Sequence, residues 1–167
     1  MKPPSNLLFD MNALRYLDQL GILTPCISMI KNPYTLDLIK EKEMRNPSWE
    51  EVEKGGMKTL GLSGKQMQEA EELRGGHKKL SIYDAGIIIL AVRKKCPLFT
   101  EDRKMIAEMK RLGVRHVCLP EMIDLMFQNE IISKEEAYQF IEVTQSTLLQ
   151  KRYDETCAKL LEKYSCS

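Results

Sequence analysis

The sequence predicts an α/β fold, in which a central parallel sheet is covered by helices on both faces. Short apolar runs alternate with segments of helical periodicity along most of the 167 residues. This alternation implies crossover connections, and crossover connections join parallel strands. A chain of this length holds one hydrophobic core. We therefore expect a single domain over residues 1–167, in which residues from about 133 to 167 form a helical extension.

Apolar runs and stop signals locate the elements of the first half of the chain. Strands are predicted at residues 7–9 and 26–30, and helices at 12–19, 32–45 and 63–74. Gly21 ends the first of these helices, Pro33 suits the first turn of the second, and Ser63 caps the third. Residues 46–62 are less regular, and the apolar spacing that begins at Trp49 indicates a short helix.

The second half of the chain carries clearer start signals. Strands are predicted at residues 97–100 and 114–119, and helices at 81–95, 102–112, 120–127, 133–150 and 154–164. Ser81 and Asp84 have the spacing of a capping box, and Ser133 with Glu136 repeats it. Gly113 ends the helix before the last strand. These signals place strands and helices in alternation up to the end of the predicted sheet.

Composition excludes several classes of protein. The formal net charge is +1, from 25 basic and 24 acidic residues, so any nucleic-acid function rests on a local basic patch. The five cysteines include no C-x-x-C pair, which argues against a zinc site or a disulfide framework and favours a reducing cytoplasm. Residues 1–6 do not form a signal peptide, and the apolar run at 85–92 is too short to span a membrane.

Two of four candidate aspartates fall where a parallel sheet binds its ligands, at the carboxyl ends of the strands. Asp10 and Asp102 follow predicted strands, Asp84 lies in the first turn of a helix, and Asp37 lies in the helix after the second strand. Singly, Asp84 and Asp102 are typical helix-capping acids, and Asp37 is typical of a solvated helix face that it shares with Glu41. A charge placed directly after a buried strand, as at Asp10, is costly unless it is paired or bound.

Taken together, these acids predict a metal site. Three carboxylates at one edge of a sheet match the oxygen ligands that Mg²⁺ and Mn²⁺ prefer. Without a cation the same carboxylates repel one another. Two metal ions about 4 Å apart can activate a water molecule and stabilise the leaving oxygen of a phosphodiester. The acid pattern therefore favours metal-dependent hydrolysis.

Three segments of the chain resemble the PIN domain family, in its stand-alone prokaryotic branch. They are LLFDMNAL at 7–14, LSIYDAGIIILA at 80–91 and PLFTEDRK at 97–104. The resemblance implies a three-layer α/β/α fold. It also implies metal-ligand and catalytic roles for Asp10, Asp84 and Asp102. The family has a glutamate in the helix after its second strand, and the best register places Asp37 there, while a shifted register chooses Glu41.

The resemblance also assigns supporting residues. Asn12 and Thr100 match positions that orient the carboxylates, although both residue types also suit local capping. Met11 departs from the small hydroxyl residue that is frequent in the family. The basic residues nearest the acids could hold RNA phosphates or could be solvated helix ends; they are Lys78, Lys79, Arg103 and Lys104.

The function implied by the resemblance is that of a metal-dependent ribonuclease using Mg²⁺ or Mn²⁺. Many stand-alone PIN domains are toxins, so the resemblance implies an antitoxin protein as partner, and homodimers are common in the family. Two alternatives remain open. A phosphatase of the haloacid dehalogenase type would need a second aspartate where Asn12 stands. A PIN-like binding module with a degraded site would explain Asp37 in place of glutamate.

Overall fold

A computed structural model describes residues 1–76 and 79–165 of the chain. It divides into two compact units, which are described separately. Residues Pro4–Val117 form the sheet unit, while Met1–Pro3 and the chain from Cys118 onward form the helical unit. The single domain expected over residues 1–167 stays a prediction.

The sheet unit contains five parallel strands in the order β3-β2-β1-β4-β5. The strands are β1 (Asn6–Phe9), β2 (Asn32–Leu36), β3 (Lys58–Leu60), β4 (Leu98–Phe99) and β5 (His116–Val117). β1 is central, because Leu8 is in register with Tyr34 of β2 on one side and with Leu98 of β4 on the other. The parallel α/β sheet predicted from the sequence is confirmed.

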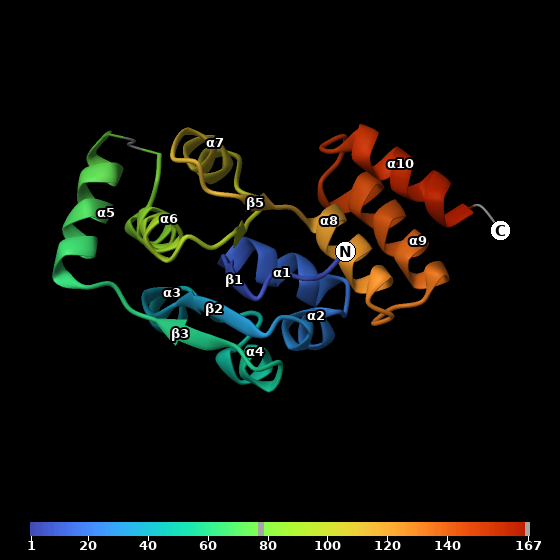
Figure 1. Ribbon diagram of the computed structural model, residues 1–167, viewed down its shortest axis with the longest axis horizontal. Helices are drawn as coiled ribbons and strands as arrows, with labels where there is room; N and C mark the ends of the chain where they lie inside the picture. The colour runs from blue at the N-terminus through green and yellow to red at the C-terminus, as the bar shows by residue number, and fades with distance from the viewer. Residues whose placement is uncertain (77–78, 166–167) are drawn as a thin grey trace. The chain divides into compact units, whose positions relative to one another are not determined.

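Helices cover both faces of this sheet. They are α1 (Met11–Gln19), α2 (Leu23–Met29), α3 (Asp37–Lys42), α4 (Trp49–Lys54), α5 (Gly64–Gly76), α6 (Ile82–Lys94) and α7 (Arg103–Arg111). α2 packs on α1 and α4, whereas α5 and α7 pack on α6. Figure 1 shows α5, α6 and α7 together on one side of the sheet and α2 with α4 on the other. Right-handed crossovers require this arrangement, since the chain adds strands first on one side of β1 and then on the other.

The core of the sheet unit lies along β1, β4 and α6. Leu8 and Phe99 are fully buried, as is most of the inner face of α6. Gly86 allows α6 to approach the sheet closely, because a Cβ there would lie 3.0 Å from a Leu36 methyl carbon and 3.1 Å from one of Leu62. The start of α6, which carries Asp84, is therefore held close to the carboxyl end of β2.

Two predictions for the first half of the chain are wrong. Of residues 26–30, predicted as a strand, 26–29 belong to α2 and Ile30 is its C-cap, and the buried Leu23, Cys26 and Ile27 have helical spacing. A short apolar run does not by itself distinguish a strand from a buried helix. The helix predicted from residue 32 is instead β2 followed by α3, since proline also fits near the start of a strand.

Other boundaries differ in smaller ways. Residues 46–62 contain the expected short helix, α4, and also the strand β3, which was not predicted. The helix predicted at 133–150 begins at the Ser133 cap as expected, but α9 (Lys134–Val143) gives way to a π-helical turn at Thr144–Leu148. The strand predicted at 114–119 is only two residues long.

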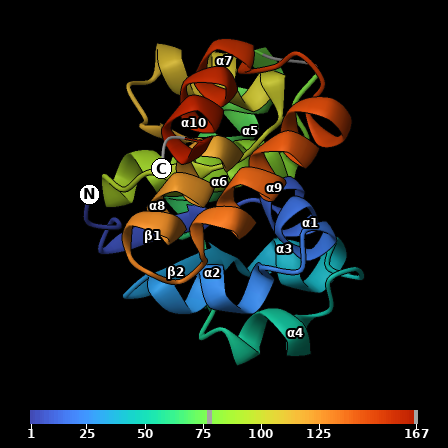
Figure 2. The same ribbon diagram turned by 90° about the vertical axis from the view of Figure 1, so that its right-hand side faces the viewer.

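The helical unit consists mainly of α8 (Leu119–Gln128), α9 and α10 (Asp154–Ser165), and both α8 and α10 pack against α9 (Figure 2). Asp124 of α8 accepts hydrogen bonds from the Tyr164 hydroxyl and the Lys163 ammonium, each at 2.6 Å. The rings of Phe127 and Tyr164 meet edge to face, with their centroids 5.1 Å apart. Over residues 1–76 and 79–165, no helix has the length and apolar character needed to cross a membrane.

Candidate functional site

The candidate site lies at the topological switch point of the sheet. The chain leaves β1 toward β2 on one side, and β4 pairs with β1 on the other. Helices therefore depart to opposite faces from these two neighbouring strands, which leaves a crevice at their carboxyl ends. Open α/β sheets bind ligands in this crevice. Asp10 directly follows β1, and Thr100 directly follows β4.

Asp10 is the most deeply buried acid of the site, with 4% of its surface exposed. Its backbone N–H donates to the Phe99 carbonyl at 3.0 Å, which ties it to the end of β4. Burial, with a smaller contribution from the carboxylates of Asp84 and Glu43, raises the pKa of its carboxyl group to about 7, against the lowering effect of the Thr100 hydrogen bond. The site therefore contains a concentration of negative charge around a buried carboxyl group.

Thr100 links Asp10 to Asp102. Its hydroxyl donates to Asp10 Oδ2 at 2.9 Å and accepts a hydrogen bond from the backbone N–H of Asp102 at 3.2 Å. His116 Nε2 lies 2.7 Å from the Thr100 carbonyl oxygen, which holds the backbone on its other side. The position expected to orient the carboxylates thus makes a direct contact with one of them.

Asp84 and Asp102 are both fixed by helix capping. Asp84 Oδ2 accepts from the Ser81 N–H at 2.8 Å, and Ser81 Oγ accepts from the Asp84 N–H at 3.1 Å, which confirms the capping box. Asp102 Oδ1 accepts from the N–H groups of Lys104 and Met105. In both residues the capping bonds use only one carboxylate oxygen, so the caps position the carboxylates without occupying both oxygens.

Glu43 is a site residue that sequence reasoning missed. It is the C-cap residue of α3, it is half-buried, and it interacts electrostatically with both Asp10 and Asp84. Burial and the Asp84 carboxylate raise its pKa, while Arg15 lowers it. Because α3 begins only at Asp37, the acid that reaches Asp10 and Asp84 is Glu43, directly after the last residue of the helix.

The two acids proposed for this position lie differently. Asp37 Oδ1 accepts from the Leu38 N–H at 2.7 Å, and Oδ2 would be 2.8 Å from a Cβ at Gly61, so its carboxylate faces the backbone beyond β3. Glu41 is exposed. The carboxylates that raise the pKa of Asp10 are those of Asp84 and Glu43. Glu43 is thus the stronger candidate for the fourth acid, and a ligand role for Asp37 stays a prediction.

The remaining predicted residues surround the acids. Asn12 is the half-buried second residue of α1. Arg103 is exposed at the start of α7, and Lys78 lies outside the described residues. Lys79 and Lys104 line one hollow of about 540 Å³, which also contains Gly76, Leu80, Ala107, Glu108 and Arg111. Two predicted phosphate contacts therefore share a basic hollow that adjoins α7.

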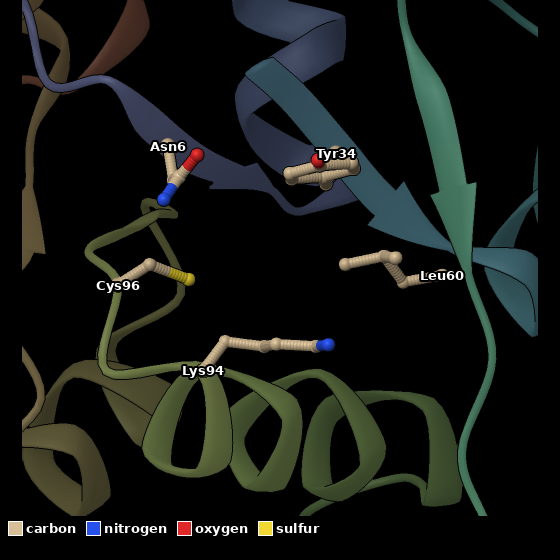
Figure 3. A pocket seen from close by; sticks show the side chains of 5 residues that line it. All are labelled: Asn6, Tyr34, Leu60, Lys94 and Cys96. Atoms are coloured by element: carbon tan, nitrogen blue, oxygen red, sulfur yellow. The ribbon is translucent and has the colours of Figure 1, made fainter.

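The acids are neighbours but do not form a closed ligand set. Within the described part of the chain, no three His, Cys, Asp or Glu side chains are arranged to hold a metal ion together. A separate hollow of about 240 Å³ lies between β2, β3 and the end of α6, lined by Asn6, Tyr34, Leu60, Lys94 and Cys96 (Figure 3). Asn6 begins β1 while Asp10 follows its end, so this hollow lies at the opposite end of β1 from Asp10.

Comparison of the chain with protein-family models gives no match, and comparison with curated proteins gives none.

Proposed function

We propose that the protein is a metal-dependent ribonuclease of the PIN type. The observation that carries the proposal is the hydrogen-bonded chain from Asp10 through Thr100 to Asp102, with Asp84 and Glu43 close enough to raise the pKa of Asp10. We call Asp10, Glu43, Asp84 and Asp102 the acid cluster. It stands at the carboxyl ends of β1 and β4, where this type of sheet binds ligands.

The chemistry of the acid cluster suits a hard divalent cation. All four side chains are carboxylates, which Mg²⁺ and Mn²⁺ prefer, and the carboxylates of Asp84 and Glu43 add to the burial that raises the pKa of Asp10. Asp10, Glu43 and Asp84 would hold the cation, with Asp102 beside them. A bound cation would polarise the phosphate and make a water molecule acidic enough to attack phosphorus.

The residues of the chain have distinct roles in this proposal. Thr100 orients the carboxylate of Asp10, and the capping bonds hold Asp84 and Asp102 in place. Lys79 and Lys104 bind phosphates of the RNA strand through charge. The deep burial of Asp10 limits access of bulk water to its carboxylate.

The physiological role that we propose is that of a cytoplasmic toxin in a toxin–antitoxin pair. It rests on the resemblance of segments 7–14, 80–91 and 97–104 to stand-alone PIN domains. The antitoxin would cover the acid cluster, and a homodimer would fit the same branch of the family. Co-expression of a toxic chain with the product of a small adjacent gene that relieves its toxicity would test this role.

One observation favours a second candidate, a PIN-like binding module without catalysis. Among the described residues, the acids do not converge into a group of three that could hold a metal ion. In an active enzyme a cation must draw Asp10, Glu43 and Asp84 together. In a binding module the same carboxylates would remain apart, and the surrounding basic residues alone would bind a partner.

The test is cleavage of a fluorescently labelled single-stranded RNA by the purified chain, with Mn²⁺ and with EDTA. We expect cleavage with Mn²⁺ only, its loss in Asp10→Asn, and its retention in Asp154→Asn, an exposed aspartate of α10. Titration calorimetry with Mn²⁺ gives an independent readout. A wild-type chain that neither cleaves RNA nor binds Mn²⁺ would establish the binding module instead.

A further inference from the structure

A third hollow lies beside the acid cluster, on the side of α1. It has a volume of about 230 Å³ and lies between α1 and the segment that follows α3. Its lining residues are Arg15, Asp18, Gln19, Glu43, Arg45 and Asn46. Glu43 belongs both to this hollow and to the acid cluster, because it interacts electrostatically with Asp10 and Asp84. The hollow therefore opens directly beside the candidate site.

Two guanidinium groups face this hollow without a competing partner. Arg15 and Arg45 are exposed, and over residues 1–76 and 79–165 neither makes a hydrogen bond or an ion pair through its side chain. Arg15 acts on Glu43 only through its longer-range charge, which lowers the pKa of that carboxyl group. By contrast, Arg93 and Arg111 are each paired with a glutamate. Arg15 and Arg45 thus retain their donors for a ligand.

The chemistry of the hollow points to a phosphate that is part of a chain. A guanidinium group binds phosphate through two parallel N–H donors, which a lysine cannot reproduce. Asp18 and Glu43 line the same hollow and make it poor at attracting a free anion. A phosphodiester in a strand whose neighbouring phosphates are already bound elsewhere on the protein can bind the two arginines despite these acids, because the strand keeps its local concentration at the hollow high.

The fold supplies the other point of attachment. α1 and α3 follow β1 and β2, whereas α6 and α7 lie on the opposite face of the sheet, where Lys79 and Lys104 line the larger hollow. The acid cluster lies between these two basic regions. A strand that reached from one to the other would pass across the carboxyl ends of β1 and β4.

We propose that Arg15 and Arg45 form a phosphate-binding subsite for single-stranded RNA, so that the substrate crosses the acid cluster from the α1 side to the α7 side. This inference rests on the proposed ribonuclease function and adds the path of the substrate. Arg15 and Arg45 act by holding the strand, and the acid cluster acts on the phosphate between the two basic regions.

The first experiment measures binding without cleavage. Fluorescence anisotropy with a labelled eight-nucleotide single-stranded RNA in EDTA compares wild type with R15A/R45A, and with K31A as a control at an exposed cation directly before β2, at the amino ends of the strands. We expect the double variant to bind about tenfold more weakly. The slope of log Kd against log salt should fall by about 1.4, since each phosphate contact to a single strand contributes about 0.7. The control should change affinity less than twofold and leave the slope within about 0.3 of wild type.

The second experiment separates holding from folding and from chemistry. With Mn²⁺, R15A/R45A should raise KM about tenfold and leave kcat within twofold, and R15K/R45K should recover part of the affinity because it keeps the charge but loses the paired donors. Unchanged thermal unfolding excludes a folding defect, and the single variants replace the double variant if it unfolds. Equal binding by wild type and R15A/R45A would overturn the subsite. Arginine-dependent binding without any cleavage by wild type would retain the subsite and refute the ribonuclease.

Discussion

The hydroxyl group of Thr100 donates a 2.9 Å hydrogen bond to the buried carboxyl group of Asp10, and so joins residues that lie 90 positions apart in the chain. Each residue follows a central strand of the sheet, so the bond connects the ends of β1 and β4. It joins two side chains of the candidate site directly and is the natural place to test the organisation of the site.

Replacing Thr100 by valine keeps the shape of the side chain and removes the donor. We expect the free energy of unfolding to fall by about 1–3 kcal/mol, because the buried Asp10 carboxyl group loses a hydrogen-bond partner. The pKa of Asp10 should rise above that of wild type, since the Thr100 hydroxyl lowers it. Urea unfolding and NMR titration measure the two effects. Thr100→Ser should restore both, and an unchanged Asp10 pKa in the valine variant would contradict the hydrogen bond.

Stability should depend on pH through Asp10. Its pKa is about 7 in the folded chain against an ordinary value of 3.8, so between these values the folded state holds a proton that the unfolded state has released. The contribution of Asp10 to the free energy of unfolding is therefore greatest below pH 4 and is lost as the pH rises through 7. Asp10→Asn should flatten that part of the profile and be more stable than wild type at pH 8. Parallel profiles for the two proteins would refute the shifted pKa.

Divalent cations should reverse this effect. Without a cation, ionised Asp10 meets the charges of Asp84 and Glu43, whereas a bound Mn²⁺ ion would neutralise them. We expect millimolar Mn²⁺ to stabilise the chain by about 2–3 kcal/mol at pH 8, for a concentration near 100 times Kd. The gain should be much smaller at pH 5 and absent in Asp10→Asn. Differential scanning fluorimetry measures it, and the same gain in Asp10→Asn would place the cation elsewhere.

The identity of the fourth acid can be tested by a matched set of variants. Glu43→Gln should weaken Mn²⁺ binding and slow RNA cleavage by about 100-fold, a typical cost of losing part of a metal site. Asp37→Asn and Glu41→Gln should each change both quantities less than threefold, because Asp37 faces Gly61 and Glu41 is exposed. Calorimetry and initial cleavage rates rank the three variants. A larger loss in Asp37→Asn than in Glu43→Gln would support Asp37 as the fourth acid, as the sequence register suggested.

Sequence reasoning located the parts of the site that depend on local signals. Asp10 and Thr100 follow β1 and β4, and Asp84 and Asp102 take part in the helix caps that their spacing indicates. Each continuous apolar run or capping pattern depends on only a few consecutive residues. They were therefore sufficient to place these side chains at one edge of a parallel sheet.

Glu43 could not be found in the same way. Its place depends on where α3 begins, and the sequence pattern started that helix five residues too early, at residue 32 rather than Asp37. The error follows from Pro33, which fits both a helix start and the beginning of a strand. Only the pairing of β2 with β1 and β3 decides between them, and that pairing joins segments distant in the chain.

Gly86, which has no side chain, sets how closely α6 approaches the sheet and therefore where the carboxylate of Asp84 lies. A methyl group there would press on the ends of Leu36 and Leu62, which would have to yield by a few tenths of an ångström or push α6 outward. Because the Ser81 cap binds Asp84 rigidly to that helix, any outward step would carry the carboxylate with it. An alanine in this position would thus change the spacing of the carboxylates on which cation affinity depends, without replacing any acid.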